Sequence, residues 1–198
     1  MGTRGFISIK SEGKIVGAYN HWDSYPTGLG VTAAEIIRTV GANGLEGLAK
    51  NVNLVTFVEE DGSPSEEQLA DLKARGFWHD VSTGTDWYAA LRGAQGDLLA
   101  YIEAGYLPGF NVKGALAKSD VFIEYGYVID LDQSLLEVYE SSGGGDPMVP
   151  MAAVSFDTIL APGFDARTAM TQIEERIAPE SMPDQAGTSG TENHTNGS

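Results

Sequence analysis

The chain has 198 residues, a formal net charge of −16 and no cysteine. The lack of cysteine excludes a disulfide framework, a thiol nucleophile and a cysteine-based zinc site. The acidic balance disfavours contact with phosphate backbones, so a nucleic-acid partner is unlikely on electrostatic grounds. We interpret the scattered acids as a solubility feature, although an acidic mimic of nucleic acid would share the same charge.

Apolar runs are too short for a membrane segment. No stretch reaches the ~18 uninterrupted apolar residues of a membrane helix, and residues 1–6 lack the apolar run of a signal peptide. We therefore expect a cytoplasmic protein with no membrane partner. Length predicts a single domain over residues 1–178. Residues 179–198 have no large apolar side chain after Met182, which is typical of a disordered acidic and polar tail.

The first predicted element is a β-hairpin. Residues 6–9 and 15–19 are β-prone, and residues 11–14 have the composition of a tight turn. The second strand leads directly into a polar and aromatic stretch that begins at Asn20.

Helices dominate the middle of the chain. Capping-box and proline signals begin them, and glycines weaken or end them. The expected elements are a helix from Thr32 that glycines weaken from residue 41, a strand over 54–58, a helix from Ser63 to Gly76, and a helix with a weak middle from Thr85 to Gly105. An apolar stripe from Trp87 to Tyr101 indicates a face packed on the core, and a partner-binding face is the alternative.

The last part of the chain predicts a second hairpin. Apolar and aromatic side chains alternate along residues 121–130 and indicate a strand. Residues 135–139 form the second strand of the hairpin. A flexible loop over 141–147, a strand over 151–156 and a helix over 165–177 follow. Together these elements predict an α+β fold, with an antiparallel sheet built from two β-hairpins and three or four packed helices.

Residues 19–30 concentrate the unusual chemistry of the chain. Aromatic side chains, a histidine, an aspartate and an asparagine are crowded at the end of a strand, as in a binding pocket. On a continuing strand, His21 and Asp23 would share one face. Because an imidazole held by a carboxylate is a usual general base, these two residues are the candidate catalytic pair.

The candidate binding residues surround this pair. The backbone N–H groups of the glycine turn would receive an anion at the start of the following helix, and an arginine near the first strand would supply positive charge. These residues are Arg4, Asn20, Trp22, Tyr25, Gly28 and Gly30. The pattern contains no metal-ligand set, and it identifies no cofactor.

Structural alternatives exist for each of these residues. Trp22 and Tyr25 would serve equally well as core residues, and Arg4 would form an ordinary ion pair with Asp23. Elsewhere, Asp130 and Asp132 have the spacing with which glycosyltransferases hold a divalent metal, but an aspartate-rich turn is the commoner explanation.

Both hairpin regions resemble a family of uncharacterised phage, bacterial and fungal proteins. The resemblance rests on an N-terminal M-x-T-R-G pattern, on Y-N-x-W-D-S-Y-P-x-G-x-G over residues 19–30, and on residues 122–132 and 136–139. It implies a family and not an activity. Some members carry cysteine at the second position, which suggests N-terminal-nucleophile hydrolases, but Gly2 has no side chain that could attack a substrate.

Two functions follow from these observations, and the sequence leaves open whether the protein is an enzyme. The first is a small-molecule site around residues 19–30, with hydrolysis as a further option. The alternative is a non-catalytic acidic protein of phage type that binds a host protein. A concave pocket at His21 would favour the first function. A flat surface with Trp22 and His21 buried, and with acids collected on one face, would favour the second.

Overall fold

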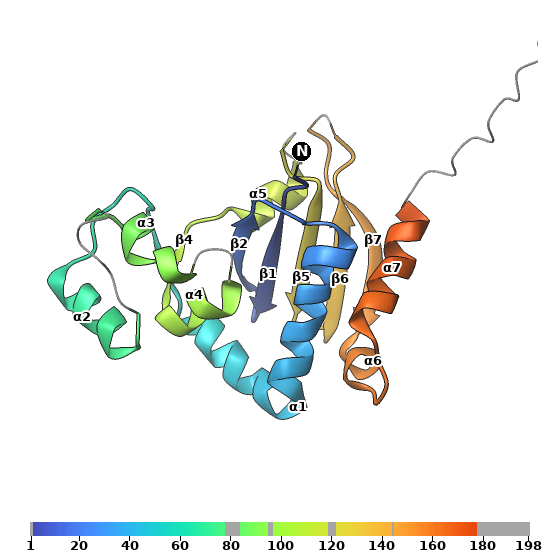
Figure 1. Cartoon of the computed structure of the whole chain (residues 1–198), viewed down its shortest axis with the longest axis horizontal. Coiled ribbons are helices and arrows are strands. Elements are labelled where there is room, and N and C mark those ends of the chain that lie inside the picture. Colours follow the sequence, from blue (N-terminus) through green and yellow to red (C-terminus); the bar gives the residue numbers. More distant parts are fainter. Residues whose placement is uncertain (1, 78–83, 95–96, 119–121, 144, 178–198) are drawn as a thin grey trace, which may run out of the picture.

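A mixed β-sheet forms the centre of the molecule (Figure 1). The computed structural model describes residues 2–77, 84–94, 97–118, 122–143 and 145–177, and within them five strands follow the order β2-β1-β5-β6-β7. These strands are β1 (Gly5–Ser11), β2 (Lys14–Asn20), β5 (Tyr125–Asp130), β6 (Leu135–Glu140) and β7 (Val149–Ser155). The tail predicted over residues 179–198 lies outside the described residues.

The sheet joins the two predicted hairpins through a parallel pair of strands. The antiparallel pairs β1–β2 and β5–β6 confirm both hairpins, and β7 also pairs antiparallel with β6. Glu12 and Gly13 have φ values of 50° and 76°, as a tight two-residue turn requires. Strand β1 runs parallel to β5, so the α+β class is confirmed while the sheet is mostly, and not purely, antiparallel. Residues more than a hundred positions apart make this pair, and the pattern within each hairpin does not encode it.

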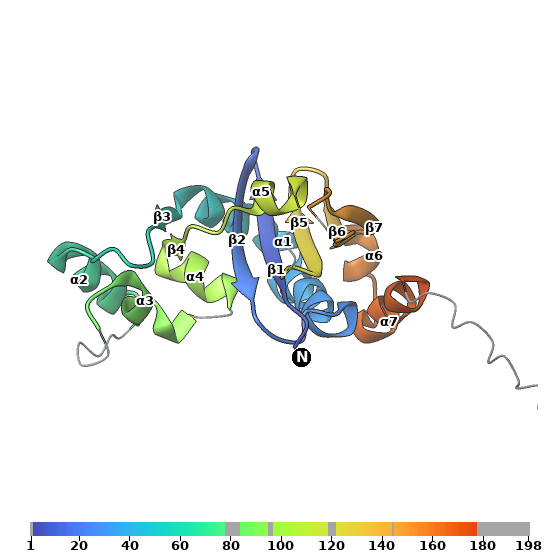
Figure 2. The same ribbon diagram turned by 90° about the horizontal axis from the view of Figure 1, so that it is seen from above.

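Helices cover both faces of the sheet (Figure 2). Ile7 and Ile9 of β1 face a core shared with α1 (Val31–Leu54), α6 (Phe156–Leu160) and α7 (Ala166–Ile177). Phe6 lies on the opposite face, which α5 (Val112–Ala117) covers. The prediction missed α5 and α6, because helices of 6 and 5 residues are too short to show a helical period.

A kink at Gly41, the first of the glycines that were expected to weaken α1, interrupts the helix, and a second helical segment follows to Leu54. Gly41 adopts φ 64° and ψ 168° and bends the helix at that point. Beyond the bend, Leu48 and Val52 are buried in the core. Packing of an apolar face therefore stabilises a segment whose intrinsic helix propensity is low.

The chain between α1 and α5 forms a lobe beside β2 (Figure 1). The lobe comprises the parallel strands β3 (Thr56–Val58) and β4 (Tyr106–Pro108) and the helices α2 (Glu66–Ala74), α3 (Trp87–Ala90) and α4 (Leu98–Ala104). Ser65, and not Ser63, caps α2 in a capping box with Gln68. The stripe from Trp87 to Tyr101 is buried, as predicted. In the part of the chain that is described, no helix has the length and apolar character needed to cross a membrane.

Candidate functional site

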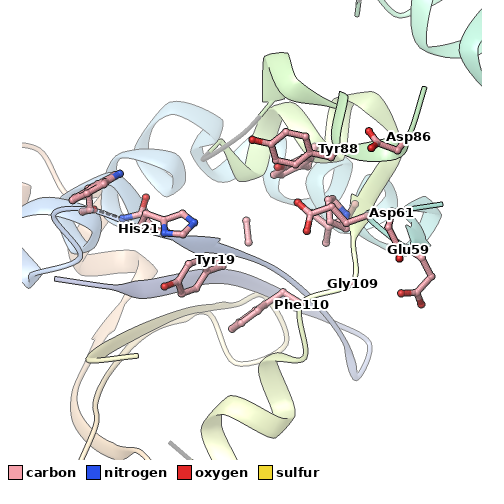
Figure 3. A pocket seen from close by; sticks show the side chains of 15 residues that line it. Tyr19, His21, Glu59, Asp61, Asp86, Tyr88, Gly109 and Phe110 are labelled. Atoms are coloured by element: carbon pink, nitrogen blue, oxygen red, sulfur yellow. Dashed lines mark hydrogen bonds between the residues drawn. The ribbon is translucent and has the colours of Figure 1, made fainter. Parts of the chain in front are cut away.

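A cavity of about 960 Å³ lies between the end of β2 and the lobe (Figure 3). Its volume falls at the upper end of the ~300–1,000 Å³ that small-molecule sites occupy. The residues that line it are Ala18, Tyr19, Asn20, His21 and Trp22 from the β2 side, Glu59, Glu60, Asp61, Asp86, Tyr88 and Tyr101 from the lobe, and Leu107, Pro108, Gly109 and Phe110 from β4 and the turn after it.

Aromatic side chains form the β2 side of the cavity. Strand β2 pairs with β1 up to Asn20, which fixes the backbone of Tyr19 and brings His21 to the rim. The centroid of the Tyr19 ring lies 4.6 Å from that of the His21 ring, in an edge-on arrangement, and 6.1 Å from that of the Phe110 ring. Trp22 is 70 % exposed, so it is not a core residue.

Acidic side chains form the opposite side. Strand β3 ends at Val58, and Glu59, Glu60 and Asp61 follow it into a turn. The backbone N–H of Tyr88 donates to the Glu60 carbonyl over 3.0 Å, which fastens this turn to α3. Asp86 caps α3 by accepting a hydrogen bond of 2.8 Å from the Ala89 N–H. Backbone hydrogen bonds therefore hold the acidic turn in place.

No basic side chain in the described part of the chain neutralises the negative charge on this side. Within the described ranges, no lysine, arginine or histidine forms an ion pair with Glu59, Glu60, Asp61 or Asp86. Burial, with the nearby Glu60 and Tyr88 adding to it, raises the pKa of Tyr101 to about 12. The cavity thus combines an aromatic wall with a negatively charged wall.

His21 and Asp23 do not form the predicted pair. Strand β2 ends at Asn20, and Asp23 has a φ of 51°, so the alternation of a strand does not extend to these residues. His21 lines the cavity and Asp23 does not. Among the described residues, neither a hydrogen bond nor an ion pair joins the two side chains. Their catalytic role stays a prediction, but the shared strand face from which it was inferred is absent.

Asp23 and Ser24 belong instead to a turn that holds the chain start against the sheet. The Asp23 carbonyl accepts a hydrogen bond of 3.0 Å from Leu29 N–H. Ser24 is fully buried, and its carbonyl accepts a hydrogen bond of 2.8 Å from the Tyr127 hydroxyl. The side-chain amide of Asn20 donates to Ser24 Oγ over 2.9 Å and to the Trp22 carbonyl. Much of the polar chemistry in residues 19–30 is therefore used within the fold.

The glycine turn also has internal partners. Gly28 and Gly30 lie in η1 (Pro26–Gly30), and both of their N–H groups donate to the Tyr25 carbonyl. The Thr27 N–H donates to Glu174 of α7 over 3.0 Å, so a carboxylate of the chain already lies at this turn. These contacts leave neither glycine N–H free for the anion that the sequence suggested.

Arg4 and Tyr25 lie away from the cavity. The Arg4 guanidinium lies 5.3 Å from the centroid of the Phe122 ring, and in the described chain it makes no ion pair with Asp23. Tyr25 is 41 % exposed, and its ring lies 6.1 Å from that of Tyr125. Of the predicted site residues, the structure therefore brings only Asn20, His21 and Trp22 to the cavity.

Asp130 and Asp132 fasten the two hairpin turns together. Asp130 is fully buried and accepts a hydrogen bond of 2.6 Å from Lys10 Nζ. Asp132 accepts one of 2.7 Å from the Glu12 N–H. This arrangement agrees with the aspartate-rich turn preferred above. No group of three or more His, Asp and Glu side chains in the described ranges is placed to hold a metal ion.

Sequence reasoning missed the acidic wall. Residues 59–61 form the longest acidic run in the chain, but the acids were interpreted as a solubility feature, and Asp86 received no functional interpretation. Both lie far along the chain from Tyr19, and their approach to it depends on how the lobe packs beside β2. Comparisons with protein-family models, curated proteins and solved structures find no match, so the family resemblance of residues 1–30 and 122–139 stays a prediction.

Proposed function

We propose that the protein binds a small molecule in the cavity between β2 and the lobe. The observation that carries this proposal is the concave site itself, which joins the rim around His21 to a wall of carboxylates that form no ion pair among the described residues. A concave pocket of this size is the usual form of a ligand site. We also propose that the protein acts in the cytoplasm, as the sequence led us to expect.

Binding is better supported than hydrolysis or host-protein binding. Hydrolysis by the predicted pair would need His21 to be oriented by a carboxylate, and in the described chain no hydrogen bond or ion pair joins it to Asp23. Binding of a host protein was expected to coincide with a flat surface, with Trp22 and His21 buried and with acids collected on one face. Of these features, the structure shows only the collected acids. The site is concave and Trp22 is exposed, which supports the small-molecule function.

A cavity-filling substitution tests this proposal. Gly109 lines the cavity, and a Cβ atom there would meet only the Val58 carbonyl oxygen, at 3.9 Å, so Gly109→Leu has room to be accommodated. Gly47→Leu on α1 is the matched control, because a Cβ atom there has no neighbour within 4 Å. A fragment screen by ligand-observed NMR, with cationic, neutral and anionic compounds, would compare both variants with wild type.

We expect ligands that bind wild type and Gly47→Leu but lose binding to Gly109→Leu. Ligands that bind all three proteins equally, or a screen with no ligand for wild type, would contradict a small-molecule function for this cavity.

A further inference from the structure

We propose that the ligand of this cavity is a small organic cation, an ammonium or guanidinium group carried on an apolar body. This inference rests on the proposed function, because it names the chemical class of ligand for the same cavity. It follows from two independent properties of the lining, one on each side.

The first property is the unpaired negative charge of the lobe side. Glu59, Asp61 and Asp86 lie across the cavity from Tyr19 and His21 (Figure 3). Among the described residues, Lys10, Arg38, Lys50 and Arg75 pair with carboxylates elsewhere in the fold, and no lysine or arginine pairs with a carboxylate here. An anionic ligand would be repelled by this wall, whereas a cation would gain Coulomb attraction that grows as water leaves the cavity.

The second property is the set of aromatic faces opposite the acids. A cation within ~6 Å of an aromatic ring centroid is attracted by the ring. The fold uses this contact at three other places, where Arg4, Lys14 and Arg38 lie 5.3, 5.6 and 5.8 Å from the centroids of phenylalanine rings. In the described chain, no lysine or arginine lies over the aromatic rings of the cavity. Trp22, which lines the cavity and is 70 % exposed, therefore offers an aromatic surface to a ligand.

The spacing of the carboxylates favours an organic cation over a metal ion. In the part of the chain that the structure describes, the acids do not form a group of three or more that could hold a metal. The charge is instead spread along one wall of a cavity of about 960 Å³. A cation with an extended apolar body fits this arrangement, because its body contacts the aromatic side while its charge faces the acids.

Three probes that share a phenyl group and differ in charge test the inference. They are 2-phenylethylamine, 2-phenylethanol and 3-phenylpropanoate, titrated into the full chain at low salt by NMR and calorimetry. We expect the amine to bind about tenfold more tightly than the alcohol, and the carboxylate not to bind.

Two variants with the same change in net charge locate the effect. The variant Glu59→Gln/Glu60→Gln/Asp61→Asn removes three of the four acids of the wall and keeps Asp86, and Glu46→Gln/Glu103→Gln/Glu175→Gln removes exposed acids that do not line the cavity. We expect the first variant to weaken amine binding about tenfold and the second to change it less than about twofold.

Equal weakening by both variants, no binding of the amine, or tighter binding of the alcohol or the carboxylate would overturn the cation class. Any of these results would leave the proposed function standing if another ligand still lost binding to Gly109→Leu. If no ligand is sensitive to Gly109→Leu, the proposed function itself fails.

Discussion

Gly28 is required by close packing within its turn. A Cβ atom at this position would lie 2.1 Å from the Asp23 carbonyl oxygen, and that carbonyl also accepts the Leu29 N–H. The same turn places Ser24 beneath the Tyr127 hydroxyl. The glycine that the sequence suggested as an anion cradle thus has a structural role in bringing two backbone segments together.

We expect Gly28→Ala to lower the free energy of unfolding by about 2–3 kcal/mol, because the added methyl group forces the turn apart. The control is Gly47→Ala in α1, where a Cβ atom has no neighbour within 4 Å. There the substitution should stabilise the protein by about 0.5–1 kcal/mol through higher helix propensity. Urea unfolding of both variants measures the two effects. Equal stability of Gly28→Ala and wild type would show that the turn is not tightly packed.

At the level of elements, a partly buried ion pair links the first hairpin to the second. Lys10 of β1 donates to Asp130 of β5, and Gln133 also donates to Asp130. Burial raises the pKa of Asp130, but the hydrogen bonds from Lys10 and Gln133 outweigh it, so the pKa lies below its ordinary value. The hydrogen bond to Asp130 raises the pKa of Lys10. The link therefore stabilises the parallel β1–β5 pair while both groups are charged.

The pH dependence of this link follows from the lowered pKa of Asp130 and the raised pKa of Lys10. The Asp130 contribution is present above about pH 4 and is lost as pH falls through its lowered pKa. The Lys10 contribution is present below about pH 10 and is lost as pH rises through its raised pKa. Both contributions are therefore complete near neutral pH.

We expect Asp130→Asn to lower the free energy of unfolding by about 2 kcal/mol at neutral pH, because Lys10 loses its charged partner. The difference from wild type should shrink as pH falls below about 4, where Asp130 becomes protonated. Denaturant unfolding across pH measures it, and a double-mutant cycle with Lys10→Met isolates the coupling between the two side chains. A difference that does not change with pH would contradict a charged link.

For the whole molecule, the net charge of −16 sets how stability responds to salt. Like charges over the surface repel one another in the folded state, and salt screens that repulsion. The described ion pairs are few and mostly exposed, so the folded state loses little stability when salt screens them.

We expect the Tm to rise by about 3 °C between about 10 and 200 mM sodium chloride, because screening relieves repulsion more than it weakens ion pairs. Differential scanning calorimetry measures this shift. The variant Glu46→Gln/Glu103→Gln/Glu175→Gln should show a smaller rise, since it carries fewer negative charges. A Tm that falls with salt would mean that specific ion pairs dominate the electrostatics of the fold.

Features that depend on neighbouring residues were predictable from the sequence. Both hairpins, the glycine end of α2 and the buried stripe from Trp87 to Tyr101 were expected and are present. Periodicity, capping and turn chemistry act over a few residues, so a local pattern carries the necessary information. The position of a candidate site at the end of β2 was predictable for the same reason.

Features that depend on distant residues needed the folded chain. The parallel pairing of β1 with β5 and the second helical segment of α1, which follows the kink at Gly41, both arise from packing between remote segments. The candidate site is of the same kind, because the acids of residues 59–61 reach the aromatic wall near Tyr19 through the lobe beside β2. Conversely, the left-handed backbone at Asp23 separates it from His21, two residues away. Local chemistry therefore marked one wall of the site, while long-range packing supplied the other and gave the cavity its charge.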